Sequence, residues 1–304
     1  MKNKRNNFIC IGAVHKDYLL LLKKKYFKYR TNPISQKKSL GGVAYNIASK
    51  FAFLNQNVEL LSINCDANIK NEIIKNNIKF TPLTRKIQDR SYTSILNSKK
   101  EMILGLANMD NYENLKFTIN TKYQKNKNII FDLNLSSKII KLLINKYHKK
   151  NFICVCGTSP HKVYKVRNLL SKIDVLILNK QECFSLTKEK NIKNSFKYLI
   201  RHNDKLTIII SNGKYKVSAY NNNNIYSCKP PKVKIINENG AGDTMSAFFI
   251  YYNFLLKSFN DIFSKSVVAG SLQASAYHSK QKNYLQKINR ISREIKITSK
   301  IYNG

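Results

Sequence analysis

Short apolar runs alternate along the chain with longer segments of helical periodicity, and this rhythm constrains the fold more than any other feature. The apolar runs have the length of buried strands and occupy residues 8–14, 58–63, 129–133, 152–156, 175–178 and 207–211. The helical segments are expected over residues 46–54, 137–149, 161–171, 191–203, 241–256 and 263–277. Strands that alternate with helices are typical of an α/β fold built around a mainly parallel sheet.

Two segments, residues 17–40 and 90–107, do not fit this alternation. The second contains two short apolar runs around a polar Asn97-Ser-Lys-Lys turn, a pattern that predicts a β-hairpin. Strands outside the α/β rhythm can form an accessory sheet over a pocket. Because the 304 residues contain no repeat and no long linker, we expect a single domain over 1–304 that carries both segments.

The chain is strongly basic, with 54 Lys and Arg residues against 17 Asp and Glu residues and a formal charge of +37. A nucleic-acid-binding protein could have this charge, because lysines release counterions from a phosphate backbone. The lysines, however, are spread over the whole chain beside Asn and Ile, as codon bias toward A and T would place them. We therefore expect no specific nucleic-acid site, although the charge favours anionic substrates.

The apolar stretches and the cysteines of the sequence indicate the cellular location of the protein. No apolar stretch approaches the ~20 residues that span a bilayer, so no membrane association is expected. The six cysteines have neither CxxC pairs nor zinc-ligand spacing, which favours reduced, buried thiols. The expected location is the cytoplasm.

The sharpest local motif is Gly240-Ala-Gly-Asp243, which precedes the apolar run of an expected helix. The backbone N–H groups of Gly240, Ala241 and Gly242 at that helix start would bind a phosphate or a developing oxyanion. Asp243 would then take a proton from a hydroxyl group that attacks this phosphate. A tight strand-to-helix turn without catalytic function would have the same sequence.

Three further features lie at expected strand ends or helix starts. Gly41 and Gly42 open a helix in which Asn46 could bind a polyhydroxyl ligand, and Asp17 could hold a diol. Asn179 and Glu182, three residues apart after a strand, could hold Mg²⁺ through water. Open α/β sheets bind ligands at the carboxyl ends of their strands, so the four features together favour one active site.

In this order, the Gly41-Gly42…Asn46, Asn179-x-x-Glu182 and Gly240-Ala-Gly-Asp243 motifs resemble those of the ribokinase (PfkB) family of sugar and nucleoside kinases. The resemblance extends over residues 9–279. It is greatest to the pseudouridine kinase branch, on the segments Asn32–Ala48, Ala107–Glu113 and Phe131–Ser136.

The resemblance implies a ribokinase-like, Rossmann-type layered α/β fold with a small β lid, and ATP-dependent phosphorylation of the 5′-hydroxyl of pseudouridine. It implies that Asp243 is the base and that residues 240–242 form the anion hole. Asp17, Gly42 and Asn46 would bind the ribose, with Asn134 near the sugar. Asn179 and Glu182 would organise Mg²⁺ and the phosphates, and Ser211 and Gly213 would contact the nucleotide. Similar families dimerise through their lids, so a homodimer is compatible with the resemblance.

One departure from the family pattern and two alternatives accompany this interpretation. Asn237 stands where the family commonly has Asp, which removes a carboxylate from the region that binds a monovalent cation in relatives and makes potassium activation doubtful. The first alternative is another kinase of the family, with a ribose, fructose or adenosine type of substrate. The second is a non-catalytic, basic nucleic-acid-binding protein that has kept a kinase fold.

Overall fold

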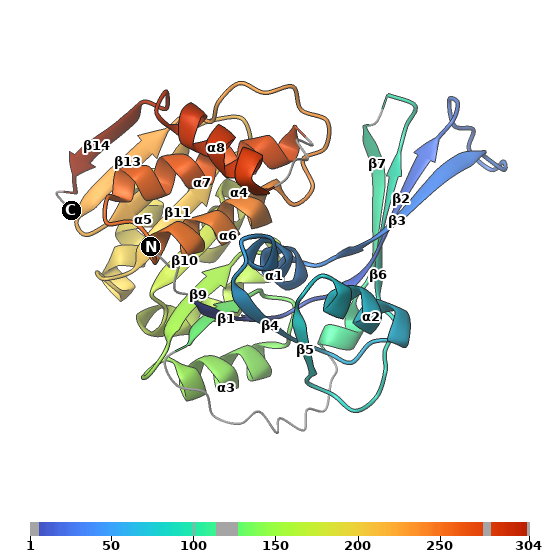
Figure 1. Ribbon diagram of the computed structural model, residues 1–304, viewed down its shortest axis with the longest axis horizontal. Helices are drawn as coiled ribbons and strands as arrows, with labels where there is room; N and C mark the ends of the chain where they lie inside the picture. Colours follow the sequence, from blue (N-terminus) through green and yellow to red (C-terminus); the bar gives the residue numbers. More distant parts are fainter. Residues whose placement is uncertain (1–5, 100, 114–126, 276–280, 303–304) are drawn as a thin grey trace.

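A large twisted sheet forms the centre of the protein, seen in a computed structural model that describes residues 6–99, 101–113, 127–275 and 281–302 (Figure 1). Ten of the described strands lie in the order β14-β13-β12-β11-β10-β9-β8-β1-β4-β5. The strands from β5 to β11 pair in parallel, and β12, β13 and β14 extend the sheet in antiparallel fashion. Their bounds are β1 Asn7–Ile11, β4 Asn57–Ser62, β5 Lys79–Pro82, β8 Asn128–Phe131, β9 Phe152–Cys156, β10 Val175–Asn179, β11 Thr207–Ser211, β12 Val217–Asn221, β13 Asn224–Cys228 and β14 Ile297–Ile301.

Helices cover both faces of this sheet and make a three-layer α/β/α core. Alternate strand residues enter opposite core clusters, as Phe8 and Cys10 do on one face and Ile9 and Ile11 on the other. The first face carries α1, α2, α6, α7 and α8, and the second carries α3, α4 and α5. The helix bounds are α1 Val43–Phe53, α2 Ala67–Lys75, α3 Ser137–Tyr147, α4 Lys180–Thr187, α5 Ile192–His202, α6 Ala241–Asn253, α7 Phe259–Ala274 and α8 Gln281–Ser292.

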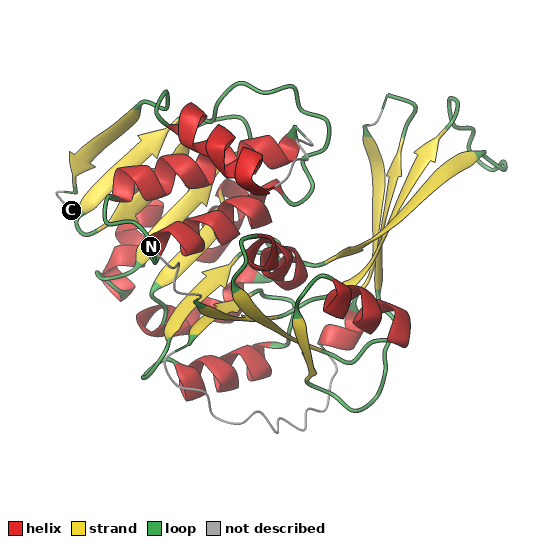
Figure 2. Ribbon diagram, viewed as in Figure 1, coloured by secondary structure: helices red, strands yellow, loops and turns green. Residues whose placement is uncertain are grey.

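A second, four-stranded sheet projects from this body (Figure 2). Its order is β3-β2-β6-β7, with β2 and β6 parallel in the centre and an antiparallel partner on each side. The bounds are β2 His15–Leu22, β3 Ile34–Gly41, β6 Ser91–Leu96 and β7 Met102–Asn108. We call this sheet the lid. It contains most of the two segments that broke the α/β rhythm, and its β6–β7 pair confirms the predicted hairpin.

Several predicted boundaries were wrong. β1 ends at Ile11, so residues 12–14 form a loop, and the helix expected from residue 46 begins at Val43. Residues 163–172 form a 3₁₀-helix, η2 Val163–Lys172, in place of the expected α-helix. The buried residues Val163, Val166 and Leu169 recur every third position, which matches the 3₁₀ repeat. The end of the helix expected over 263–277 lies partly outside the described residues.

Gly42 fixes the junction between the lid and helix α1. Its φ angle of 108° is rarely adopted by residues with a side chain, and it is the N-cap residue of α1. A Cβ atom at this position would lie 2.4 Å from the carbonyl oxygen of Ala13. Both the backbone conformation and the close approach therefore require glycine.

We expect Gly42→Ala to lower the free energy of unfolding by at least about 2 kcal/mol, because strain and collision act together. Gly242→Ala is the matched control, since no atom lies within 4 Å of a Cβ built there and its φ angle is ordinary. Urea unfolding of the control should agree with that of the unchanged protein within about 0.5 kcal/mol. Equal stability of both variants would contradict this account of the junction.

Candidate active site

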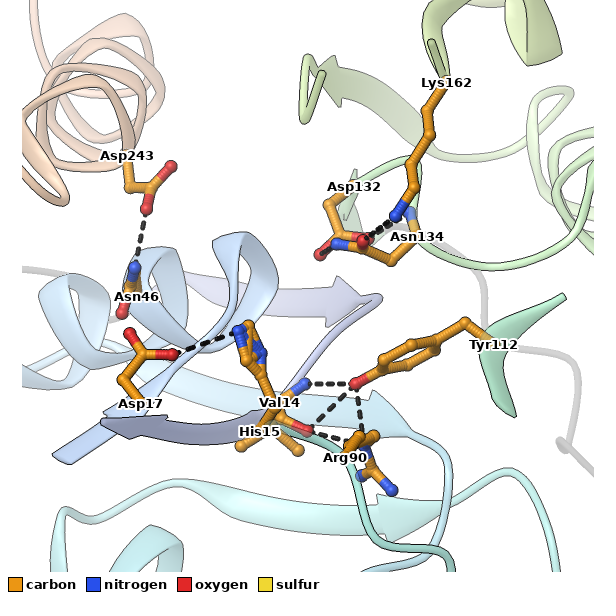
Figure 3. Close-up of polar contacts among 10 residues, drawn as sticks. All are labelled: Val14, His15, Asp17, Asn46, Arg90, Tyr112, Asp132, Asn134, Lys162 and Asp243. Carbon is orange, nitrogen blue, oxygen red and sulfur yellow. Dashed lines mark hydrogen bonds and ion pairs between the residues drawn. The ribbon is translucent and has the colours of Figure 1, made fainter. Parts of the chain in front are cut away.

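Asp243 and Asn46 meet where the first turns of α6 and α1 face each other. The Asn46 Nδ2 atom donates a hydrogen bond of 2.7 Å to Asp243 Oδ2 (Figure 3). The two residues are 197 positions apart in the chain, so the contact results from the packing of α1 on α6. A carboxylate held by one amide keeps its other oxygen atom for a further donor.

The pKa of Asp243 is raised to about 6, mainly by burial and in addition by the negative charges of Asp132, Glu182 and Asp17. The hydrogen bond from Asn46 acts in the opposite direction, because it favours the charged form. A carboxylate with a pKa near 6 is ionised at pH 7 and is a stronger base than an exposed aspartate. This suits general-base chemistry.

Asp17 is the third residue of β2, near the start of the lid. Burial raises its pKa to about 6. Its Oδ1 atom lies 3.3 Å from His15 Nε2, but burial, together with the charges of Arg90 and Lys162, lowers the pKa of His15 to about 4. The ring is therefore neutral at pH 7, and the contact is not an ion pair. His15 is only 8% exposed.

Asn134 is held by two side chains that sequence reasoning did not assign to the site. Asp132 Oδ1 and Oδ2 accept hydrogen bonds from the backbone N–H and the side-chain amide of Asn134, at 2.8 and 3.1 Å. Lys162 Nζ donates to Asn134 Oδ1 at 2.7 Å (Figure 3). Asp132 had a readable signal, a charged residue directly after a buried strand. Lys162 had none, because it is one of 54 basic residues in the chain.

Two cavities border the start of α6. Gly240 and Thr244 line a cavity of about 290 Å³ between the lid and α1, together with Asp17 and Asn46. Ala241 and Gly242 line a second cavity of about 610 Å³. The glycine turn that precedes Asp243 therefore separates two adjacent binding spaces.

The N–H groups at the start of α6 differ in availability. Ala241 donates to the carbonyl oxygen of Glu238 at 3.1 Å, whereas Gly242 and Asp243 have no acceptor within the described part of the chain. Free N–H groups at the positive end of a helix attract anions. The amides of Gly242 and Asp243 are therefore available for an anion, while that of Ala241 is already engaged.

The larger cavity suits a nucleotide. The predicted residues Asn179, Ser211 and Gly213 lie together on its wall with Ala241 and Gly242. Part of its lining is apolar, as a base requires. Its apolar residues include Val217, Val233, Ile235, Met245, Val267 and Ala274. The segment 233–236, which alternates like a strand, is irregular and forms part of this wall.

Asn179 and Glu182 form a capping box at the start of α4. Glu182 Oε2 accepts a hydrogen bond from the Asn179 N–H at 2.8 Å, and Asn179 Oδ1 accepts from the Glu182 N–H at 2.9 Å. Burial raises the pKa of Glu182, while the bond from Asn179 opposes this rise. One oxygen atom of Glu182 lies outside the box, so the donor set fits Mg²⁺ held through water. Glu182 itself does not line the larger cavity.

Other kinds of site are not found among the residues that the structure describes. No group of three His, Cys, Asp or Glu side chains is placed to hold a metal ion. None of the described helices has the length and apolar character needed to cross a bilayer. All six cysteines are free and buried.

A protein-family model for pfkB family carbohydrate kinases matches residues 5–282. The chain belongs to this family. Members of this family are phosphotransferases that act on hydroxyl groups. No curated protein sequence matches the chain.

Solved structures show the same ribokinase-like fold at low sequence identity. A carbohydrate kinase from Agrobacterium tumefaciens is 19% identical, with a TM-score of 0.79 over 97% of this chain and 100% of that one. A ribokinase from Cryptococcus neoformans in complex with ADP is 14% identical, with a TM-score of 0.69 over 95% and 100%. The tetrameric inhibited form of phosphofructokinase-2 from Escherichia coli is 15% identical, with a TM-score of 0.75 over 95% and 99%.

The pKa of Asp243 predicts the acidic side of the pH profile. With Asp243 and Asp17 both needed in ionised form, kcat/KM should fall as the pH drops below about 6. Asn46→Ala removes a hydrogen bond to the charged form, so the pKa of Asp243 rises. The acidic limb should then shift upward by about one to two pH units.

The control is Asn76→Ala, which removes an amide bonded to the Tyr45 hydroxyl group and leaves both carboxylates untouched. Its acidic limb should stay in place. If the acidic limb of the Asn46→Ala profile does not shift, this hydrogen bond does not control the pKa of Asp243.

Proposed function

We propose that the protein is an ATP-dependent kinase that phosphorylates the 5′-hydroxyl of pseudouridine to give pseudouridine 5′-phosphate. One observation carries the kinase assignment: the Gly240–Gly242 turn lines both cavities, and Asp243 follows it directly. A donor phosphate in one cavity and an acceptor hydroxyl in the other would meet at this carboxylate. Phosphoryl transfer depends mainly on such positioning and on charge stabilisation.

In the proposed reaction, Asp243 accepts the proton of the acceptor hydroxyl as the oxygen atom attacks the γ-phosphorus of ATP. An oxygen–phosphorus bond forms, the bond to the leaving ADP oxygen breaks, and the proton passes from Asp243 to solvent. The N–H groups of Gly242 and Asp243 stabilise the negative charge that develops on the transferring group. Asp17 and Asn46 orient the ribose from the lid side.

ATP would occupy the larger cavity, with its base against the apolar wall and its phosphates toward α6. Glu182 and Asn179 would hold Mg²⁺ through water, and the bound ion would neutralise phosphate charge. A resident monovalent cation is not part of the proposal, because Asn237 supplies no carboxylate. The Asn237 Oδ1 atom instead accepts a hydrogen bond from the Asn239 N–H at 3.0 Å.

The choice of pseudouridine rests on the branch-like segments Asn32–Ala48, Ala107–Glu113 and Phe131–Ser136. Residues of all three segments lie in one region with Asp17 and Asp243, which supports this choice: Asn46 from the first, Tyr112 from the second, Asp132 and Asn134 from the third (Figure 3). Other family substrates, such as ribose, fructose or adenosine, are the nearest alternative. They share the transfer chemistry and differ in contacts beyond the hydroxyl groups.

Turnover of a substrate panel tests the proposal. With ATP and Mg²⁺, we expect phosphorylation of pseudouridine at a kcat/KM at least about a hundredfold above that of uridine, adenosine, ribose or fructose. Pseudouridine and uridine differ only in the atom that joins the base to the ribose, so this pair isolates the branch assignment. Preference for another substrate of the panel would contradict the assignment of pseudouridine and support the assignment as a kinase. A folded protein that turns over none of them but binds polyanions would support the non-catalytic alternative.

We also propose that two copies pair through the lid. The edge strand β7 exposes Met102, Ile103, Leu104 and Leu106, with 41–64% of each residue accessible. An exposed apolar edge strand readily accepts a second strand, and the same edge of an identical chain is complementary to it. The sedimentation mass at about micromolar concentration should therefore be that of a dimer.

Leu104→Glu should shift this equilibrium toward the monomer, because it places a charge in the apolar contact. Leu142→Glu is the control, since Leu142 is equally exposed at 47% but lies on α3, away from the lid. A monomeric unchanged protein, or equal masses for both variants, would contradict dimerisation through β7.

The proposed location is the cytoplasm, where the free, buried thiols stay reduced. We propose no specific nucleic-acid partner. The charge of +37 instead predicts weak polyanion binding that disappears with added salt.

A further inference from the structure

Arg90 is a buried charge without an acidic partner. It is only 3% exposed, and no carboxylate in the described ranges lies within ion-pair distance of it. A charged group without a counter-ion is costly to bury unless its donors are fully satisfied. The N–H groups of Arg90 therefore require neutral acceptors.

The guanidinium group binds the loops that follow two neighbouring strands of the central sheet. Its Nε atom donates to the Val14 carbonyl oxygen at 2.7 Å, after β1. Its Nη2 and Nη1 atoms donate to the carbonyl oxygens of Ile63 and Asn64 at 2.8 and 3.0 Å, after β4. Nη1 also donates to the Gln88 carbonyl oxygen at 2.8 Å.

Tyr112 completes the cluster. Its hydroxyl group accepts hydrogen bonds from Arg90 Nε at 2.8 Å and from the Val14 N–H at 2.9 Å, and donates to the Val14 carbonyl oxygen at 2.9 Å (Figure 3). The side chain is fully buried, and Arg90 lies 5.2 Å from the centre of its ring. The hydroxyl group thus joins Val14 to Arg90.

This cluster sits where the chain crosses between the core and the lid. Val14 precedes β2, Arg90 precedes β6, and Tyr112 follows β7 shortly after it leaves the lid. The remaining crossing is tied to the same place, because His15 pairs with Gly41 in the lid sheet. All four connections of the lid are therefore fixed at one point.

We infer that Arg90 and Tyr112 are positioning residues for the acceptor substrate: they fix the root of the lid and, through it, the place of Asp17 beside Asn46 and Asp243. Asp17 follows Val14 by three residues and pairs with Tyr92, two residues after Arg90. If the lid moves, its strands must then bend beyond the Asp17–Tyr92 pair, and Asp17 keeps its place relative to the core. The inference rests on the proposed role of Asp17 as an acceptor ligand.

Tyr112→Phe tests this inference with the loss of one oxygen atom, which leaves the buried Val14 N–H without that acceptor. We expect the KM of the acceptor that the substrate panel identifies to rise about tenfold, and the KM of ATP to stay within about twofold. Arg90→Lys keeps the charge but cannot reach the same set of carbonyl groups, so it should act in the same direction and more strongly. Should Arg90→Lys fail to fold, Tyr112→Phe decides.

Tyr284→Phe is the control. Its hydroxyl group is also buried and donates to the Ala269 carbonyl oxygen at 3.0 Å, but it joins α8 to α7, far from the lid. This variant should lose stability without a change in the KM of the acceptor. Equal KM values in Tyr112→Phe and the control would overturn the inference, as would an equal rise for acceptor and ATP in Tyr112→Phe.

Hydrogen exchange gives a readout that does not depend on turnover. The Lys16 amide bonds to the Arg90 carbonyl oxygen at 3.3 Å and should exchange at least about tenfold faster in Tyr112→Phe than in the control. Unchanged exchange would overturn the inference even if the panel finds no substrate. If exchange is faster but no substrate of the panel is phosphorylated, the role of the cluster in fixing the root of the lid stands, and the proposed acceptor is refuted.

Discussion

The carboxylate of Asp132 lies fully buried at the carboxyl end of β8 and accepts four hydrogen bonds from three parts of the chain. The donors are the N–H groups of Ala13, Ala44 and Asn134 and the side-chain amide of Asn134, at 2.8 to 3.1 Å. The loop after β1 can approach this carboxylate so closely because residue 12 is glycine. A Cβ atom at this position would lie 2.2 Å from the carboxylate. Asp132 therefore sets the start of α1, and α1 in turn brings Asn46 to Asp243.

Negative charge gathers at this edge of the sheet in a chain that is otherwise strongly basic. Asp17, Asp132, Glu182 and Asp243 are close enough for the first three to raise the pKa of the fourth. Nearby ammonium groups balance part of this charge: Lys162 faces Asp132, and Lys50 faces Asp243. Burial lowers the pKa of both lysines, while these carboxylates oppose the change. The proposed site thus combines a carboxylate suited to general-base chemistry with nearby cations that would attract a phosphorylated ligand.

The sequence predicted the parts of the fold that depend on local pattern. Buried strands and amphipathic helices have periodicities that can be read directly from the sequence, and the glycine pairs mark where α1 and α6 begin. The spacing of Asn179 and Glu182 correctly placed the two residues together at a strand end. The structure adds that they cap α4 with each other, a use of the same spacing that competes with ion binding.

Long-range contacts of single charged residues could not be predicted. Arg90 and Lys162 are two basic residues among 54. The loops after β1 and β4 give Arg90 its partners, and the loop after β8 gives Lys162 its partner Asn134. The 3₁₀ form of η2 is likewise a tertiary outcome, since its residues also fit a helical pattern. Asp132 is the exception, because a charged residue that ends a buried strand signals a polar network at the edge of the sheet.

Phosphoryl transfer by Asp243→Asn tests the central claim most directly. The substitution keeps the size of the side chain and removes the base, so ATP should bind with unchanged affinity while kcat falls by about 10²–10⁴. Loss of transfer with retained ATP binding is the result that a base at Asp243 predicts. A variant that transfers phosphate at the original rate would show that the carboxylate between the two cavities is not the base.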